Sequence, residues 1–181
     1  MTFISLSVGL EGSGKTLYAV LISYIYKKKY GYKIISNMKS LTFKDYDIDI
    51  LPLLMDKEND DGQNYLALID EIYHYVDSRR AISDKNISTS YSIFQLRKKR
   101  INLLGTAQYY RSIDVRTRSV FTNVFFSEYN KNSHLLSIRR FNGYLMYMGE
   151  TNIIINPVLY NMYWHREVIN DKRPLFNLSE A

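Results

Sequence analysis

The sequence contains no cysteine, which excludes disulfide bonds and zinc sites built from thiolates. Its three histidines are too far apart in the chain to suggest a metal cluster: His74, His134 and His165. No apolar run approaches the ~20 residues that cross a bilayer, and the N-terminus lacks the basic and then apolar layout of a secretory signal. We therefore expect a protein that has no membrane span and works in the cytoplasm.

Basic residues outnumber acidic ones in this chain. Its 181 residues include 24 Lys and Arg against 18 Asp and Glu, which gives a formal net charge of +6. Such a surplus favours an anionic partner such as nucleic acid, because clustered cations release counterions when they neutralise phosphates. Solubility alone is the alternative explanation. The 17 tyrosines also allow two interpretations, since tyrosine stacks on bases and packs in protein cores.

Segments with strand and helix character alternate over the first two thirds of the chain. Short apolar runs indicate buried strands, and apolar residues at helical spacing indicate helices. The strands are expected at residues 3–8, 33–37, 64–69 and 101–107, and the helices at 15–28 and 88–99. Residues 39–63 are less regular and receive no function. The alternation predicts an α/β fold of three layers with a mostly parallel central sheet.

The pattern changes near residue 120, where a run of strands replaces the alternation. Asn142-Gly143 lies between two apolar runs and is a strong hairpin signal. Asn156-Pro157 predicts an N-cap and a proline at the first position of a helix that extends to about residue 169. The strands are expected at residues 120–128, 134–141 and 144–149. We expect one domain over residues 1–181, with a core in 1–125 and C-terminal strands and a helix in 120–181.

The segment Gly9-Leu10-Glu11-Gly12-Ser13-Gly14-Lys15-Thr16 satisfies the P-loop pattern in full, between a strand and a helix. Glycines let successive backbone N–H groups wrap phosphates, and the helix N-terminus adds partial positive charge. Lys15 is suited to bridge the β- and γ-phosphates of ATP, and the Thr16 hydroxyl to bind Mg²⁺. The candidate nucleotide-binding residues are Gly9, Glu11, Gly12, Ser13, Gly14, Lys15 and Thr16.

Two carboxylates, Asp70 and Glu71, follow a buried strand directly. The carboxyl ends of strands are the edge at which open α/β sheets bind ligands. Asp70 is suited to hold magnesium through water, and Glu71 to polarise the water that attacks the γ-phosphate. Two solvated acids at a strand end are the alternative interpretation.

A third cluster surrounds the strand expected at 101–107, which is followed by Gln108. A glutamine amide there is suited to sense the γ-phosphate or to position water, although a surface glutamine is the alternative. Basic residues flank the strand on both sides, namely Arg97 to Arg100 before it and Arg111, Arg116 and Arg118 after it. These arginines are either solvated surface residues, contacts to DNA, or a finger that reaches a neighbouring subunit's phosphate.

Together these motifs resemble the FtsK–HerA branch of P-loop ATPases, notably viral genome-packaging ATPases and the Zot-like assembly proteins of filamentous phages. Ile34-Ile35-Ser36-Asn37 looks like that family's second strand ending in asparagine, and Arg79 follows Asp70-Glu71 at a similar spacing. The stretch from Arg97-Lys98 through Gln108 to Asp114 and Arg118 is also similar. The resemblance covers residues 3–125 and implies a RecA/FtsK-like three-layer fold, here with C-terminal antiparallel strands.

The resemblance also implies an activity. It gives Lys15, Thr16, Asp70, Glu71 and Gln108 the P-loop, magnesium, catalytic-base and sensor roles, with Arg97 or Arg118 as a trans-acting arginine. The implied protein hydrolyses ATP with Mg²⁺ and translocates double-stranded DNA as a ring of six or five subunits. A viral packaging motor of this kind works in the host cytoplasm, transiently at the virion, and meets a capsid or vertex protein.

Three other functions remain open at this stage. A nucleoside or nucleotide kinase is also a small P-loop domain, but the zinc cysteines of thymidine-kinase-like chains and an arginine-rich lid are both missing. A Zot-like assembly or export ATPase fits the motifs, but those proteins carry a membrane-spanning segment, so packaging is preferred. A slow nucleotide-binding assembly module would not need Glu71 as a water-activating acid.

Overall fold

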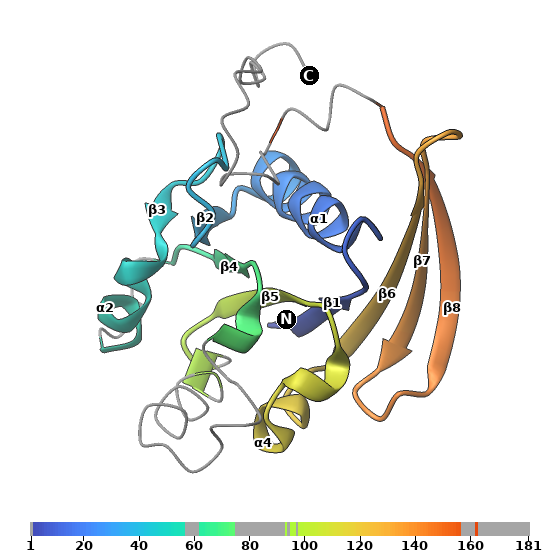
Figure 1. Ribbon diagram of the computed structural model, residues 1–181. Helices are drawn as coiled ribbons and strands as arrows, with labels where there is room; N and C mark the ends of the chain where they lie inside the picture. Colours follow the sequence, from blue (N-terminus) through green and yellow to red (C-terminus); the bar gives the residue numbers. More distant parts are fainter. Residues whose placement is uncertain are drawn as a thin grey trace.

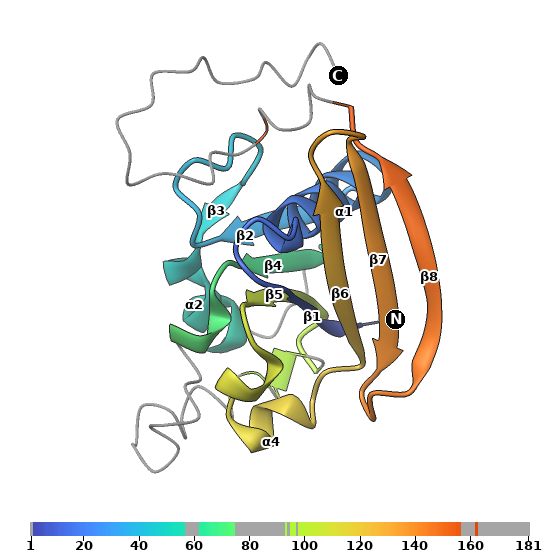
Figure 2. The ribbon, with the colours of Figure 1, turned by 45° about the vertical axis from the view of Figure 1, so that its right-hand side comes forward.

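The structure is a computed structural model that describes residues 2–56, 62–74, 93, 95, 96, 98–156 and 162. In this part of the chain, eight strands form one sheet in the order β3-β2-β4-β5-β1-β6-β7-β8 (Figures 1 and 2). The strands are β1 Ile4–Val8, β2 Lys33–Ser36, β3 Tyr46–Asp47, β4 Tyr65–Ile69, β5 Ile101–Ala107, β6 Asn123–Asn130, β7 Leu135–Asn142 and β8 Tyr147–Ile154.

The sheet has a parallel part and an antiparallel part. From β3 to β6 every neighbouring pair of strands is parallel, and β5 lies between β1 and β4. The remaining pairs, β6 with β7 and β7 with β8, are antiparallel. Because parallel strands point the same way, the carboxyl ends of β1, β2, β4 and β5 meet at one edge of the sheet. The mixed α/β fold expected from the sequence is confirmed.

Helix α1 (Lys15–Tyr30) crosses one face of the sheet, as Figure 1 shows. It ends at Gly31, whose left-handed backbone (φ 69°) lets its N–H donate to the carbonyl of Lys27 at 3.1 Å. The N–H of Tyr32 donates to the carbonyl of Tyr26 at 3.2 Å, and the bond from Gly31 to Lys27 is that of an αL C-cap. Helix α1 therefore extends two residues beyond the end expected at residue 28.

Each face of the parallel part is covered by apolar side chains. On β4, Leu66 and Leu68 join the core beneath α1, whereas Tyr65, Ala67 and Ile69 join the core on the opposite face. That opposite core also receives side chains from α2 (Leu51–Asp56) and from the segment that carries α4 (Val115–Arg118). Burial of each large apolar side chain contributes about 1.5–3 kcal/mol, so the central strands are held firmly from both sides.

The irregular residues 39–63 contain more regular structure than the sequence indicates. Strand β3 pairs with β2 in this stretch, and α2 follows a 3₁₀ turn at Ile48–Ile50. Pro52 is the second residue of α2, where its missing N–H costs no helical hydrogen bond. The connection therefore covers the sheet next to β4.

Two expected strand boundaries in the antiparallel part are wrong. β6 begins at Asn123 rather than at 120, because Val120 and Phe121 still belong to the turns that follow α4. β8 is Tyr147–Ile154 rather than 144–149. The hairpin at Asn142-Gly143 is confirmed, but its loop is longer, because the Asn142 side-chain oxygen accepts the N–H groups of both Tyr144 and Met146.

Two expected helices lie mostly outside the described residues. Of the helix expected at 88–99, the residues Ile93, Gln95 and Leu96 are helical, and Ile93 and Leu96 are buried in the core opposite α1. The helix expected at 156–169 is outside the described residues except for its first residue and Met162, which packs in the core beneath α1. Among the described helices, none is long and apolar enough to cross a membrane.

Candidate nucleotide-binding site

The P-loop follows β1 at the carboxyl edge of the sheet. Gly12 and Gly14 have φ angles of 77° and 83°, a left-handed region that residues with side chains rarely adopt. The N–H of Gly9 donates to the carbonyl of Ala107 at the end of β5 (3.2 Å), which ties the start of the loop to the neighbouring strand. Glycines occur here because the loop turns sharply through left-handed backbone conformations. Glu11 lies in the exposed part of this turn.

Helix α1 begins inside the site. Its N-cap, Gly14, has no side chain to cap the helix, so the first-turn N–H groups remain available to an anion. Ser7 of β1 donates its hydroxyl to the carbonyl of Lys15 at 3.1 Å, which fixes the helix start against the strand. The Lys15 side chain is only 9% exposed, so this cation is held inside the molecule and does not extend into solvent.

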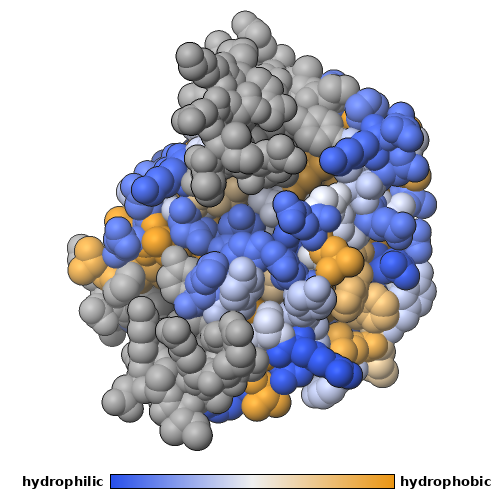
Figure 3. Space-filling view, in the orientation of Figure 1, coloured by the Kyte–Doolittle hydropathy of each residue, from blue (hydrophilic) through white to orange (hydrophobic). Residues whose placement is uncertain are grey.

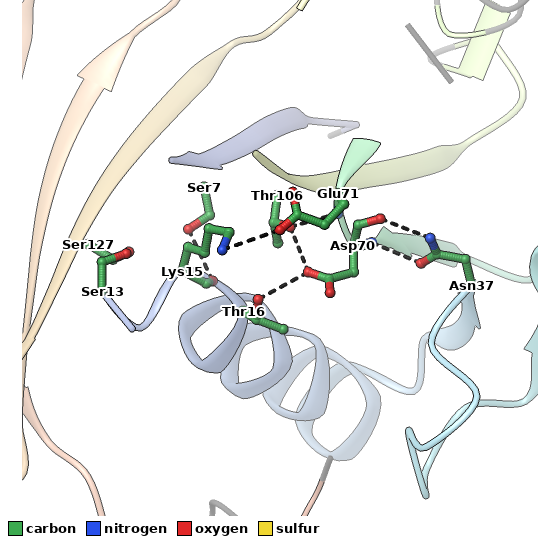
Figure 4. Close-up of polar contacts among 9 residues, drawn as sticks. All are labelled: Ser7, Ser13, Lys15, Thr16, Asn37, Asp70, Glu71, Thr106 and Ser127. Atoms are coloured by element: carbon green, nitrogen blue, oxygen red, sulfur yellow. Dashed lines mark hydrogen bonds and ion pairs between the residues drawn. The ribbon is translucent and has the colours of Figure 1, made fainter. Parts of the chain in front are cut away.

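Asp70, just beyond β4, faces the start of α1 (Figure 4). The Thr16 hydroxyl donates to Asp70 Oδ1 at 3.0 Å, and the Thr106 hydroxyl donates to the same oxygen at 2.6 Å. A hydroxyl and a carboxylate are the oxygen ligands that Mg²⁺ prefers, and this pair already lies at hydrogen-bond distance. Thr16 and Asp70 therefore fit the magnesium role expected of them.

Glu71 is paired with the P-loop lysine. Its Oε1 lies 3.4 Å from Lys15 Nζ, and its Oε2 is buried with no hydrogen-bond partner among the described residues. A buried carboxylate oxygen without a donor is costly, so this atom is ready to accept a proton from a bound molecule. Glu71 also has a φ of 51°, and this turn of the backbone directs the chain away from β4.

Polar residues at the ends of two strands flank the two acids. Asn37, after β2, exchanges two hydrogen bonds with the main chain of Asp70, and Thr106 of β5 accepts the N–H of Glu71. The sequence analysis singled out Asn37 only through the family resemblance and gave neither residue a role. Their positions at the carboxyl ends of strands on either side of β4 were the available signal.

The antiparallel strands contact the loop from the other side. Ser127 of β6 lies 3.5 Å from Ser13, hydroxyl to hydroxyl. A methyl group built on Gly14 would lie 2.7 Å from Leu136 of β7 and 2.9 Å from Tyr129 of β6, so glycine is needed for space as well as for backbone shape. Burial raises the pKa of Tyr129 above its ordinary value of 10.0, which keeps this phenol protonated. Sequence analysis missed these three contacts because they join distant segments.

No described contact joins the remaining candidate residues to the residues around Asp70 and Glu71. Gln108 lies directly after β5 and is half-buried, as a sensor at this edge requires. Arg118 lies in α4, on the face opposite α1, with its guanidinium carbon 5.5 Å from the Tyr110 ring centroid and its Nε buried without a hydrogen-bond partner in the described chain. Arg79 and Arg97 lie outside the described residues.

Among the coloured residues, the middle of the visible face is hydrophilic. In the orientation of Figure 1, hydrophilic residues extend across the middle of the visible face, and apolar residues gather mainly towards its margins (Figure 3). The site residues therefore combine a cationic loop, two acids and several hydroxyl groups within one edge of the sheet. Such a set can bind a polyphosphate, hold a divalent cation and accept a proton from water.

Compared by sequence, the chain matches no protein-family model and no curated protein. By structure it is similar to the N-terminal domain of zonular occludens toxin from Neisseria meningitidis, with a TM-score of 0.67 and 16% identity over 91% of this chain and 100% of that one. The genome packaging NTPase B204 from Sulfolobus turreted icosahedral virus 2, in complex with ATP-gammaS, has a TM-score of 0.59 and 12% identity over 85% and 98% of the two chains.

The pCW3 conjugation coupling protein TcpA, in monomer form with ATPgS, has a TM-score of 0.59 and 12% identity over 84% of this chain and 60% of that one. At these identities the likenesses establish the fold. The chain has the three-layer α/β fold of P-loop NTPases, with a mostly parallel sheet and antiparallel strands at its C-terminal side. The resemblance predicted from the motifs is therefore confirmed for the fold.

Proposed function

We propose that this chain is an ATP-hydrolysing motor that moves double-stranded DNA, and that the task it serves is packaging of a viral genome. One observation carries the ATPase part of the proposal. The P-loop lysine is paired with an acid that has a spare buried oxygen, next to a threonine hydroxyl bonded to a second acid. These are the groups that bind a nucleoside triphosphate and activate water against it.

Binding of ATP rests on the loop and on α1. Backbone N–H groups of the loop and of the first turn of α1 would donate to phosphate oxygens, and Lys15 would move from Glu71 to the β- and γ-phosphates. Thr16 and Asp70 would hold Mg²⁺. When bound, Mg²⁺ neutralises charge on the phosphates as the leaving group departs. The exchange of partners by Lys15 releases Glu71 for its own task.

Glu71 then acts as the general base. It accepts a proton from water as the water oxygen bonds to the γ-phosphorus and the bond from that phosphorus to the bridging oxygen breaks, giving ADP and phosphate. The Gln108 amide at the end of β5 orients the water or senses the γ-phosphate. Its half-buried position at the same edge supports this role.

The DNA-translocating part rests on different support. The net charge of +6 favours an anionic partner, and the fold is shared with a protein described as a genome packaging NTPase and another described as a conjugation coupling protein. We propose a ring of six or five copies in the cytoplasm, in which neighbouring P-loop domains move DNA by moving relative to one another. A capsid or vertex protein would receive this ring at the virion.

A ring also gives the arginines a role. The Arg118 Nε is buried without a partner in the described chain, and the guanidinium rests on Tyr110 rather than on its own P-loop, so we propose that it or Arg97 completes a neighbour's site. A Glu71→Gln subunit and an Arg118→Ala or Arg97→Ala subunit should each be inactive alone. Mixed rings should recover part of the activity, because some interfaces then pair an intact acid with an intact arginine.

A Zot-like assembly ATPase is the second candidate, favoured by the fold shared with the zonular occludens toxin domain over 91% of this chain. The decisive assay measures steady-state ATP hydrolysis with and without double-stranded DNA, with Glu71→Gln as the inactive control. Stimulation by DNA supports the motor. Hydrolysis that DNA leaves unchanged favours the assembly ATPase, and phosphate transfer to a nucleoside in place of water reveals a kinase.

A further inference from the structure

We propose that Asn37 and Thr106 are positioning residues that together hold the Asp70-Glu71 peptide and so decide where the Glu71 carboxylate lies. The inference rests on the proposed ATPase function and adds two residues to its machinery. Neither side chain needs to touch nucleotide for this role. Each acts through hydrogen bonds to the backbone or carboxylate of the two acids (Figure 4).

Asn37 continues the pairing of β2 with β4 after the strands themselves end. The last paired residues of these strands are Ser36 and Leu68. Beyond them, the Asn37 side-chain N–H donates to the carbonyl of Asp70 at 2.9 Å, and its side-chain oxygen accepts the N–H of Asp70 at 2.8 Å. A primary amide presents one donor and one acceptor as a peptide does, so this side chain replaces a strand neighbour.

Thr106 holds the same peptide from the other side. Pairing of β4 with β5 ends at Ile69 and Gly105, one residue before the acids. The Thr106 hydroxyl is fully buried, accepts the N–H of Glu71 at 2.9 Å and donates its single proton to Asp70 Oδ1 at 2.6 Å. One hydroxyl therefore sets the orientation of both acids, because it fixes the backbone of one and the carboxylate of the other.

The backbone of Glu71 shows why two such anchors are needed. Its φ of 51° lies in the left-handed region, which residues other than glycine adopt rarely. An unfavourable backbone conformation persists only where its surroundings determine it, and here Asn37 fixes the residue before it and Thr106 fixes its own N–H. This turn places the Glu71 carboxylate 3.4 Å from Lys15 Nζ.

The test compares Thr106→Val, which keeps the shape and loses the hydroxyl, with Thr106→Ser, which restores it. A displaced general base lowers the rate of the chemical step, so we expect kcat to fall about 10- to 100-fold in Thr106→Val, with affinity for a non-hydrolysable ATP analogue within about 3-fold of wild type. Thr106→Ser should return kcat to within about 3-fold of wild type. Asn37→Asp, which replaces the amide donor by an acceptor, should lower kcat in the same way.

The two anchors differ in one further measurement. Of the two anchors, Thr106 alone bonds to the Asp70 carboxylate, so Thr106→Val should also raise the Mg²⁺ concentration needed for half-maximal hydrolysis. Asn37→Leu, which removes both hydrogen-bonding groups without adding a charge, should leave this concentration nearly unchanged. The matched control is Thr122→Val. The partly buried Thr122 hydroxyl also bonds to two backbone groups, because it donates to the carbonyl of Ile4 (2.9 Å) and accepts the N–H of Ile4 (3.3 Å). These contacts lie at the opposite edge of the sheet.

The outcomes separate a wrong inference from a wrong function. A wild-type protein that hydrolyses no nucleotide defeats the proposed function itself. If wild type is active and Thr106→Val keeps its full kcat, the function stands and the positioning role is overturned. Equal losses in Thr106→Val and Thr122→Val, in proportion to their loss of thermal stability, also overturn it. A Thr106→Ser variant that folds normally but does not recover kcat also overturns the positioning role.

Discussion

The parallel and antiparallel parts of the sheet are built differently and serve the site differently. Every residue of β1, β4 and β5 is buried, whereas β8 is exposed at most positions. The parallel strands direct Lys15, Asp70 and Glu71 to one edge, because their carboxyl ends coincide. The antiparallel strands instead lie against the P-loop through side chains that fill the space beside its glycines. Chemistry therefore belongs to one part, and support of the loop to the other.

The largest effect is expected at Lys15. Lys15→Ala removes the buried cation of the loop, which is the side chain suited to bridge the phosphates, so productive binding of nucleotide should be lost. Isothermal titration with a non-hydrolysable ATP analogue measures this. Lys131→Ala, which removes an exposed lysine from the turn between β6 and β7, is the matched control and should bind normally. Normal binding by Lys15→Ala would remove the basis for the P-loop assignment.

Glu71→Gln should separate binding from hydrolysis. The amide cannot accept the proton of water, so hydrolysis should fall by about 100-fold or more. Affinity for the analogue should equal or exceed that of the wild type, because Lys15 no longer has to break an ion pair with a carboxylate before it binds phosphate. Glu128→Gln, at an exposed position of β6, should change neither quantity. If Glu71→Gln loses binding and hydrolysis together, the acid has a structural role and the assignment of the base is wrong.

Gly14→Ala tests the contact between the two parts of the sheet. The added methyl group meets Leu136 and Tyr129 below 3.0 Å and requires a backbone with φ 83°, so we expect analogue affinity to fall about 10-fold or more. Gly149→Ala in β8 has a φ of 136° but nothing within 4 Å, so it should lower stability and leave affinity unchanged. Equal affinities in the two variants would show that β6 and β7 do not support the loop.

The smallest effect is expected at Asp114, in the connection between β5 and β6. Hydrogen bonds from the Arg116 side chain and backbone hold the pKa of Asp114 below its ordinary value of 3.8. A lowered carboxyl pKa stabilises the fold above the ordinary value, and this contribution is lost as pH falls through the lowered one. Asp114→Asn should cost about 1–2 kcal/mol of unfolding free energy at pH 7.

The difference between Asp114→Asn and wild type should shrink in urea melts below pH 3.8, where the wild-type carboxyl also becomes neutral. Glu128→Gln gives the comparison from the antiparallel part. Its carboxylate lies 3.8 Å from Arg139 in an exposed pair, so removal of the charge should have no measurable effect at any pH. A cost for Asp114→Asn that is independent of pH would contradict the charge-based explanation.

The sequence predicted the features that depend on neighbouring residues. The P-loop, the buried strand before Asp70 and the hairpin at Asn142 follow from local patterns, and all three are found as expected. Contacts between distant segments were not accessible in this way. Ser13 and Ser127 are 114 positions apart, and the pairing of Lys15 with Glu71 depends on β5 lying between their two strands.

Some errors had a local cause that a pattern of apolar residues cannot detect. The strand expected at 144–149 is displaced because the Asn142 side chain binds two N–H groups and lengthens the loop, with Leu145 at a φ of 59°. The contacts of Thr106 with the two acids were missed for a similar reason, since one hydroxyl among buried apolar residues resembles ordinary strand composition. The assignments of Arg97 and Arg118 remain predictions.

The contact between Lys15 and Glu71 has a consequence for how a catalytic cycle would close. Without nucleotide, the two opposite charges neutralise each other, so the loop attracts anions less strongly than it would with an unpaired lysine. After the proposed hydrolysis, the same carboxylate would compete with phosphate for the lysine, and its return would help to expel the product. The acid that starts the reaction would then also reset the site, which couples one turnover to the readiness for the next.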